Sequence, residues 1–440
     1  MSALSRFISS INPYTLLMLG YITLMIVGAI LLSLPFVHEE PVSFLDALFT
    51  AISAVSTTGL ITVSTPDSYN LAGEIIIILL IQIGGIGYMS LASFVVLANR
   101  KKISTLSESL IKTDFSLPEG FSIVEFIRSV VIFAFSIEAV GALALFFLFR
   151  QADTPDAFWQ AIFHSISAFC TAGFSLFNNS LEDFKFNFWI NLIITLLALG
   201  GSIGFIVFSD VYLRVTGRKK QLTYTSRIIL RFTLVFISVG SFIVFLAESQ
   251  FDSYSSENSL LVAIFQVMTA STTVGFNTYA IGDLSSGVLF LIVVMMLSGA
   301  SPSGTGGGIK STTITALYAV MMCTLRGKEY ITFSQRTIPP DKVRLAATNF
   351  FFYIIVLGVG IFLLSQVEEH PIFEVIFEAT SALGTVGLST GITGALTPLG
   401  KIFIIMLMFL GRVGPITFGL ALMKTEQTST VREEMGDIVI

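Results

Sequence analysis

Residues 49–60 read FTAISAVSTTGL, and this pattern recurs three times later in the chain without a gap. The other copies are FHSISAFCTAGF (163–174), FQVMTASTTVGF (265–276) and FEATSALGTVGL (377–388). Each copy has Ser or Thr in the fifth place, Ala in the sixth, Thr in the ninth and Gly in the eleventh. The glycines are separated by 114, 102 and 112 residues, close to a quarter of the 440-residue chain. A fixed period with a matching local pattern indicates an internal repeat.

The composition places these repeats in a membrane. The chain is 54% hydrophobic and only 12% charged, whereas soluble domains carry about 25% charged residues. The net charge of −5 offers no basic face and therefore argues against a nucleic-acid partner. An integral membrane protein is the class that fits.

Apolar segments of about 20 residues can each cross the hydrocarbon core. An eighth crossing, 288–325, is interrupted by the polar run SGASPSGTGGGIK (298–310). Eight crossings place both termini on the same side. The seven uninterrupted candidates are 15–36, 73–98, 126–149, 188–213, 228–247, 345–364 and 401–423.

Basic residues indicate which side that is. They concentrate in the connections 99–120, 214–231 and 326–344, the first of which holds Arg100, Lys101, Lys102 and Lys112. The opposite connections carry mainly acids, such as Glu39, Glu40, Asp252, Glu257, Glu368 and Glu369. By the positive-inside rule, the cell membrane holds this multi-pass chain with both termini in the cytoplasm.

One copy of the repeated pattern lies between each pair of spans and is too short to cross. We therefore expect an all-α integral membrane protein made of four parallel units, each a span, a pore helix and a span, around a pseudo-fourfold ion pore. The unit boundaries are 1–112, 113–222, 223–335 and 336–440, and the C-terminus is cytoplasmic. The alternative reading is that each Ser/Thr-Xaa-Gly is a helix cap followed by a tight turn.

A pore explains the residue types better than caps do. Irregular backbone at membrane depth is tolerated only where it is buried in protein or lines a water-filled cavity. Helix C-termini carry partial negative charge, and glycine allows carbonyls to turn toward one axis. Uncharged carbonyl rings suit a weakly hydrated monovalent ion, so potassium is the expected substrate. The predicted ion-binding filter is Ser56, Thr57, Thr58, Gly59, Cys170, Thr171, Ala172, Gly173, Thr272, Thr273, Val274, Gly275, Gly384, Thr385, Val386 and Gly387.

The polar run 298–310 allows three interpretations. A linker between two spans would move the basic loop 326–344 outside and break the parity. A nucleotide phosphate loop needs a second glycine where Ile309 stands, counting from Gly304. We expect instead that this second span, and only this one, breaks at membrane depth and forms a gating loop within 298–311, although a rigid glycine-rich packing surface is the alternative. The predicted loop residues are Gly299, Ser301, Pro302, Ser303, Gly304, Thr305, Gly306, Gly307, Gly308 and Lys310.

Arg412 is costly inside a span and should face water or a partner. Aligning GRVGP (411–415) with GGIGY (84–88) and GSIGF (201–205) places it near the pore axis, opposite Gly85 and Ser202. We expect a pore barrier to cations at Arg412. The alternative is a structural tie through carbonyls or through Glu138, which lies inside another span.

The four filter glycines, the run 298–310 and GRVGPITF (411–418) resemble the Trk, Ktr and HKT potassium transporter superfamily, most closely its bacterial KtrB-type membrane subunit. The resemblance implies potassium uptake that responds to sodium, in a homodimer with one pore per subunit in the bacterial inner membrane. It implies a cytosolic ring of nucleotide-binding regulatory subunits of the RCK/KTN type, so the nucleotide belongs to the partner.

In that superfamily, members with serine in place of the first filter glycine tend to pass sodium, so the resemblance implies that Gly59 favours potassium. Membrane lipid is the other expected partner, with no transition-metal site, no covalently bound cofactor and no enzymatic activity. An alternating-access sodium/potassium secondary transporter is the second hypothesis, although parallel repeats favour a fixed pore. A non-conducting scaffold is the third, and it leaves the four filter segments unexplained.

Overall fold

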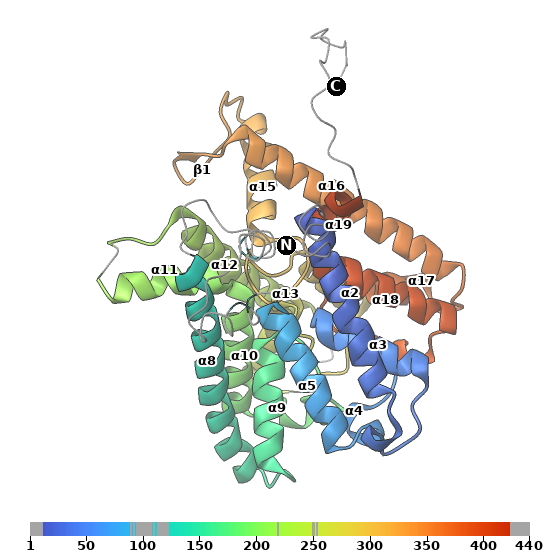
Figure 1. Ribbon diagram of the computed structural model, residues 1–440. Helices are drawn as coiled ribbons and strands as arrows, with labels where there is room; N and C mark the ends of the chain where they lie inside the picture. The colour runs from blue at the N-terminus through green and yellow to red at the C-terminus, as the bar shows by residue number, and fades with distance from the viewer. Residues whose placement is uncertain are drawn as a thin grey trace.

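The computed structural model describes residues 12–88, 90, 93, 108, 111, 123–217, 220–248, 251 and 254–422. Within them the chain is almost entirely helical, and one order of elements recurs: a long helix, a short helix and an interrupted helix (Figure 1). The first two sets are α2 (Pro13–Leu32), α3 (Phe44–Ser56) and α5 (Leu71–Ile86), then α8 (Ile123–Gln151), α9 (Ala157–Phe169), α10 (Phe188–Ile203) and α11 (Phe205–Val215). The last two are α12 (Tyr224–Ala247), α13 (Ser256–Thr272), α14 (Ser286–Leu297) and α15 (Ser311–Leu325), then α16 (Pro340–Ser365), α17 (Ile372–Gly384), α18 (Pro398–Val413) and α19 (Pro415–Leu422).

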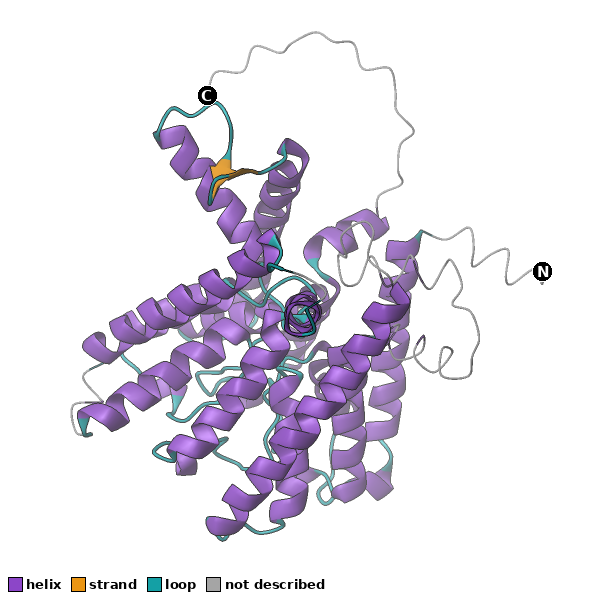
Figure 2. Ribbon diagram, turned by 90° about the vertical axis from the view of Figure 1, so that its left-hand side faces the viewer, coloured by secondary structure: helices purple, strands orange, loops and turns teal. Residues whose placement is uncertain are grey.

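The remaining elements are short. Among the described residues they are the helix α4 (Thr65–Ser68), the 3-10 turns Pro35–Val37, Glu182–Phe184, Ile281–Asp283 and Thr393–Ala395, and a two-stranded antiparallel hairpin of β1 (Thr332–Phe333) and β2 (Arg336–Thr337). The hairpin joins α15 to α16 and projects away from the other helices (Figure 2).

Among the described residues, four single helices are long and apolar enough to cross a membrane, and two bent helix pairs could raise the number to six. The four are α2, α12, α16 and residues Ile127–Gln151 of α8. They match the predicted first spans of the four units. Their starts follow ordinary capping rules, since Asn12 and Thr223 each accept a backbone N–H of the first turn and Pro13 and Pro340 occupy first positions where no N–H is needed.

The expectation that only one second span breaks is wrong. The chain bends by 98° between α10 and α11 and by 91° between α18 and α19. The hinges are Gly204 (φ +91°) and Gly414 (φ +84°), and α5 likewise ends at Gly87 (φ +86°). All three occupy the fourth place of the aligned motifs GGIGY, GSIGF and GRVGP. A positive φ ends a right-handed helix, so the shared glycine ends α5 and interrupts the other two spans although the flanking residues are apolar.

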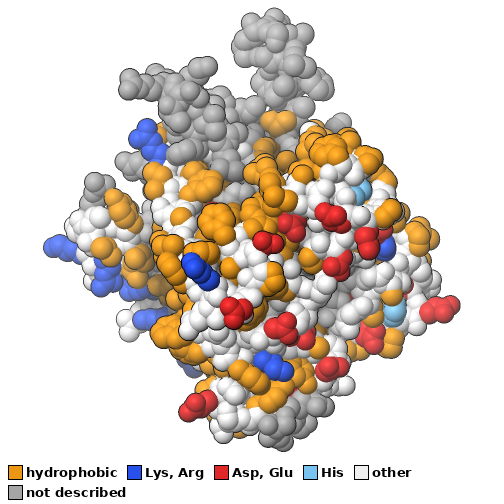
Figure 3. Space-filling view, turned by 90° about the horizontal axis from the view of Figure 1, so that it is seen from below, with side chains coloured by type: hydrophobic (Ala, Val, Ile, Leu, Met, Phe, Trp, Pro, Cys, Tyr) orange, Lys and Arg blue, Asp and Glu red, His pale blue; other side chains and the backbone are white. Residues whose placement is uncertain are grey.

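The two ends of the described chain lie side by side. The side chains of Asn12 and Thr15 donate hydrogen bonds to the carbonyls of Leu420 (3.2 Å) and Ala421 (3.0 Å), so α2 packs against α19. The opposite end of the molecule carries many acidic side chains and fewer basic ones (Figure 3). Of the residues used for orientation, Arg100, Lys101, Lys102, Lys112 and Asp252 lie outside the described residues, as do residues 1–11 and 423–440.

Candidate functional site

The C-termini of the four short helices lead into one repeated backbone turn. The ninth-place threonines have φ of +55°, +52°, +60° and +49°, and the glycines two residues later have φ of +92°, +66°, +85° and +92°. The left-handed region is unusual for a β-branched residue, and such strain persists only where the surroundings enforce it. The residues are Thr57, Thr171, Thr273 and Thr385 with Gly59, Gly173, Gly275 and Gly387.

The four glycines form a closed ring. A Cβ atom on any one of them would lie 3.0–3.2 Å from the Cα of the glycine in the next copy, in the order Gly59, Gly173, Gly275, Gly387 and back to Gly59. The same Cβ would overlap the carbonyl oxygen of the residue before that next glycine, which is Ala172, Val274, Val386 or Thr58. The ring therefore has no room for side chains at these positions. The C-termini of α3, α9, α13 and α17 all lead into it, and these helix ends carry partial negative charge.

The fifth-place hydroxyls explain part of the repeated pattern. The hydroxyl oxygens of Ser53 and Ser381 each accept the backbone N–H of the following ring glycine at 3.1 Å. Ser167 donates instead to the carbonyl of Phe174 at 2.8 Å. In three copies, therefore, the short helix holds its own turn through a buried serine.

The polar run 298–310 lies directly against this turn and touches all four copies. Thr305 Oγ1 lies 2.9 Å from Thr171 Oγ1, and the Thr305 carbonyl accepts from Thr57 Oγ1 at 3.3 Å. The next two residues, Gly306 and Gly307, pack so closely on the turn that neither could carry a side chain. A Cβ on Gly306 would overlap Thr273 Oγ1, and one on Gly307 would overlap Thr385 Oγ1. Three consecutive loop residues thus cover the four ninth-place threonines.

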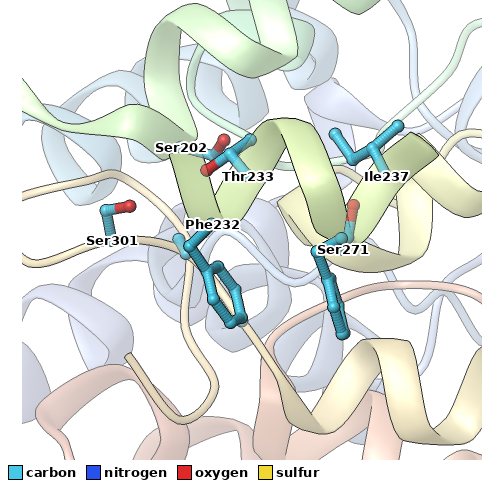
Figure 4. A pocket seen from close by; sticks show the side chains of 9 residues that line it. Ser202, Phe232, Thr233, Ile237, Ser271 and Ser301 are labelled. Carbon is cyan, nitrogen blue, oxygen red and sulfur yellow. The ribbon is translucent and has the colours of Figure 1, made fainter. Parts of the chain in front are cut away.

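The loop is attached to the break between α10 and α11. Ser301 N donates to Ser202 O (2.9 Å), Thr305 N to Gly201 O (3.1 Å) and Phe205 N to Ser303 O (3.2 Å). Beside this attachment a small cavity of about 10 Å³ is lined by Ser202 and Ser301, by Phe232, Thr233 and Ile237 of α12, and by Ser271 of α13 (Figure 4). Lys310 closes the loop on itself by donating to Gly306 O at 2.7 Å.

Arg412 bridges the loop to the first unit. One guanidinium nitrogen donates to Thr305 O (2.5 Å) and to Thr57 Oγ1 (3.1 Å), and the other donates to Gly84 O. The guanidinium also lies over the Tyr21 ring, 5.8 Å from its centroid. Arg412 therefore contacts Thr57 of the ninth-place turn and binds carbonyls of the loop and of α5, which are the contacts that the structural-tie alternative expects.

Glu138 is engaged elsewhere. Gln82 donates to both of its carboxylate oxygens at 2.9 and 2.8 Å, and the Cys170 thiol lies 3.8 Å from one of them. The Cys170 side chain thus points behind the ring, toward α5 and α8, although its backbone belongs to the predicted filter. Gln82 was not predicted as a site residue, and its one signal in the sequence is that it is a lone amide inside an apolar span.

Comparisons with known proteins identify the family of this chain. A family model described as a cation transport protein, TrkH, matches residues 9–432. The chain belongs to the TrkH family. The Ktr system potassium uptake protein B of Bacillus subtilis is 35% identical over 97% of this chain and 96% of that protein. The potassium/sodium uptake protein NtpJ of Enterococcus hirae is 34% identical over 92% of each chain.

A solved structure shares the fold of this TrkH-family chain. The crystal structure of the potassium transporter TrkH from Vibrio parahaemolyticus superposes with a TM-score of 0.72, covering 92% of this chain and 85% of that one at 21% identity. Family membership and the apolar helices together establish a membrane protein of a cation transport family.

Proposed function

We propose that this chain takes up potassium ions through the ring of Gly59, Gly173, Gly275 and Gly387. The observation that carries the proposal is the closed ring itself, in which four strained turns from four parts of the chain meet in a fixed order. The hydroxyls of Thr273 and Thr385 are buried there and have no hydrogen-bond partner within the described residues. Buried polar atoms of this kind are expected to meet water or an ion.

Potassium fits the chemistry of the ring. The predicted filter residues are uncharged, so the backbone carbonyls and the four helix C-termini supply the negative potential. A large monovalent cation loses its hydration shell to such carbonyls more readily than a divalent ion does. Two relatives carry potassium, or potassium and sodium, in their names, which supports this choice. Sodium-responsive uptake remains part of the proposal.

The run 298–310 is proposed as the gate and Arg412 as its clamp and pore barrier. The loop covers the turns of all four units, so an ion leaving the ring would have to pass it. Arg412 binds the loop carbonyl at Thr305 and adds a positive charge beside the same path. Both effects oppose cation exit until the loop moves.

The surroundings complete the proposal. The chain would lie in the bacterial inner membrane as a homodimer, with one conduit per subunit and both termini in the cytoplasm. The β1–β2 hairpin follows α15 after a connection of residues 326–331, and α15 begins at the end of the proposed gating loop. A cytosolic ring of nucleotide-binding subunits that pulls on this region could therefore reposition the loop.

The test is potassium-dependent growth of an uptake-deficient host. The parent chain should restore growth at low potassium, and Gly173→Val should abolish it because the ring has no room at that position. Gly287→Val is the matched control, since a Cβ at Gly287 on α14 meets nothing within 4 Å. Normal growth with a folded Gly173→Val protein would contradict the proposed path.

The gate has its own test. Gly306→Ala should displace the loop from Thr273 and raise potassium uptake in the absence of the cytosolic partner. Uptake per folded subunit that falls in this variant, with and without the partner, would mean that the loop supports the path and does not close it.

A further inference from the structure

The second place of each copy of the repeated pattern carries a buried polar residue. These residues are Thr50, His164, Gln266 and Glu378, each with 0–1% of its surface exposed. Within a membrane-embedded bundle, an isolated buried polar group is costly unless it is hydrogen-bonded. The repeat thus preserves polarity at this place while changing the chemical type. The contacts of two of these residues share one geometry.

Glu378 binds the segment that follows its own ring glycine. It accepts hydrogen bonds from Ser389 Oγ and from Thr393 Oγ1, the latter at 3.0 Å. Ser389 lies two residues beyond Gly387, and its hydroxyl oxygen also accepts the N–H of Gly391 at 2.9 Å. The carboxylate of α17 therefore fixes the backbone immediately after the ring.

His164 makes the equivalent contact in the second copy. Its Nε2 lies 2.9 Å from Ser175 Oγ, and its Nδ1 lies 2.8 Å from Gln160 O. Ser175 lies two residues beyond Gly173, and its hydroxyl oxygen accepts the N–H of Phe177 at 3.0 Å, which repeats the turn at Ser389. The imidazole also stacks on Phe177, with ring centroids 4.6 Å apart.

The contacts of Glu378 and His164 lie after the ring glycines Gly387 and Gly173, and the fifth-place serines contact the chain at the turn itself. Ser381 holds the N–H of Gly387 from one side, and Glu378 holds Ser389 on the other. Gly173 and Gly387 are not neighbours in the ring order, so the two sets of contacts lie at opposite corners. The other two corners lack a serine at this place, having Ile61 and Asn277 instead.

We propose that Glu378 and His164 are positioning residues that set the ion preference of the ring by holding the backbone just beyond Gly387 and Gly173. The inference rests on the proposed filter function. Preference for potassium over the smaller sodium ion requires that the carbonyls cannot close in freely. Loosening the segment after a ring glycine would permit that adjustment while leaving the path open, so selectivity would fall before throughput does.

The experiment measures uptake of potassium and of sodium, per folded subunit, in vesicles containing the full chain. Glu378→Ala should lower the potassium-to-sodium ratio by about threefold to tenfold, the factor expected for one or two lost hydrogen bonds. Ser389→Ala removes the other partner from a less buried position and should give a similar loss. The double variant should be no worse than Glu378→Ala alone, because that change already removes the contact with Ser389.

A conservative replacement separates positioning from charge. Glu378→Gln should retain most of the ratio, since its amide oxygen can accept from Ser389 and glutamine already occupies the equivalent place at Gln266. His164→Gln should be tolerated for the same reason, whereas His164→Ala should not. A Glu378→Gln protein as impaired as Glu378→Ala would overturn the inference, because the carboxylate charge would then be the cause.

Two further variants distinguish a failure of the positioning inference from a failure of the proposed filter. Thr380→Val, on the same helix, removes a buried hydroxyl that donates to the helix carbonyl of Ile376, and it should leave the ratio unchanged. Gly387→Ala alters the ring directly. If Gly387→Ala changes the ratio but Glu378→Ala and Ser389→Ala do not, the inference is wrong and the filter stands. If a folded Gly387→Ala protein also keeps the parent ratio, the filter proposal itself is wrong.

Discussion

At the scale of single residues, the ring positions require glycine because the space around them cannot hold a side chain. Gly59 has a φ of +92°, and a Cβ there would overlap the carbonyl oxygen of Ala172. Gly59→Ser should therefore shift the carbonyls of both units and lower the potassium-to-sodium uptake ratio by about tenfold. A tenfold change in the ratio corresponds to about 1.4 kcal/mol, which lies within the range of strain energies expected for such a backbone. Gly287→Ser is the control. An unchanged ratio in a folded Gly59→Ser protein would contradict the filter assignment.

Arg412 combines a charge with two hydrogen-bonding arms, and these can be separated. Arg412→Ala should raise potassium flux about threefold to tenfold, because the loop loses charge-assisted hydrogen bonds and the path loses a positive charge. Arg412→Lys keeps the charge but not the fork, so its flux should lie between those of the parent and Arg412→Ala. Reduced flux per folded subunit in Arg412→Ala would show that the arginine supports the path structurally.

Residue identities in the ring were predictable because four copies of one pattern could be aligned. The threonines and glycines of that pattern occupy equivalent turns in the structure. The contacts of Glu138 with Gln82, and of Glu378 with Ser389, were not predictable. Each joins residues whose proximity depends on helix packing, and no local spacing encodes it.

At the scale of elements, the breaks in the second spans depend on one glycine each. Gly414→Ala adds backbone strain only, since the nearest atom to its Cβ is Thr417 Oγ1 at 3.8 Å. We expect a loss of about 1–2 kcal/mol of stability. Gly204→Ala adds a clash with the loop carbonyl of Pro302, 2.6 Å away, so it should lower the melting temperature further and alter gating as well. Thermal unfolding in detergent compares the two, and equal losses would argue against the contact between this hinge and the loop.

These breaks show where sequence reasoning reached its limit. The long first helices could be predicted from apolar length alone, and the break in the span 288–325 could be predicted from the polar run 298–310. The glycines at 87, 204 and 414 were visible in the same alignment that placed Arg412. Their apolar neighbours favoured the prediction of continuous helices. Composition alone does not show whether a glycine has a positive or a negative φ.

At the scale of the whole molecule, an ion pair joins the first and last units. Lys401 at the start of α18 lies 2.7 Å from Asp46 in the first turn of α3, with side chains only 14% and 15% exposed. Thr62 also donates to this carboxylate at 2.7 Å. Lys401→Met should lower stability by about 1–2 kcal/mol, more than an exposed ion pair would cost. Asp46→Asn combined with Lys401→Met should recover part of the loss, and simple additivity of the two single changes would contradict a direct pair.

The central claim is that cations pass through the ring formed by the four turns. The most direct measurement is anomalous diffraction from crystals of the full chain grown with rubidium in place of potassium. The account predicts rubidium peaks on the axis of the ring, within coordination distance of carbonyls from residues 56–58, 170–172, 272–274 and 384–386. Rubidium bound elsewhere in the molecule, with none at the ring, would contradict it.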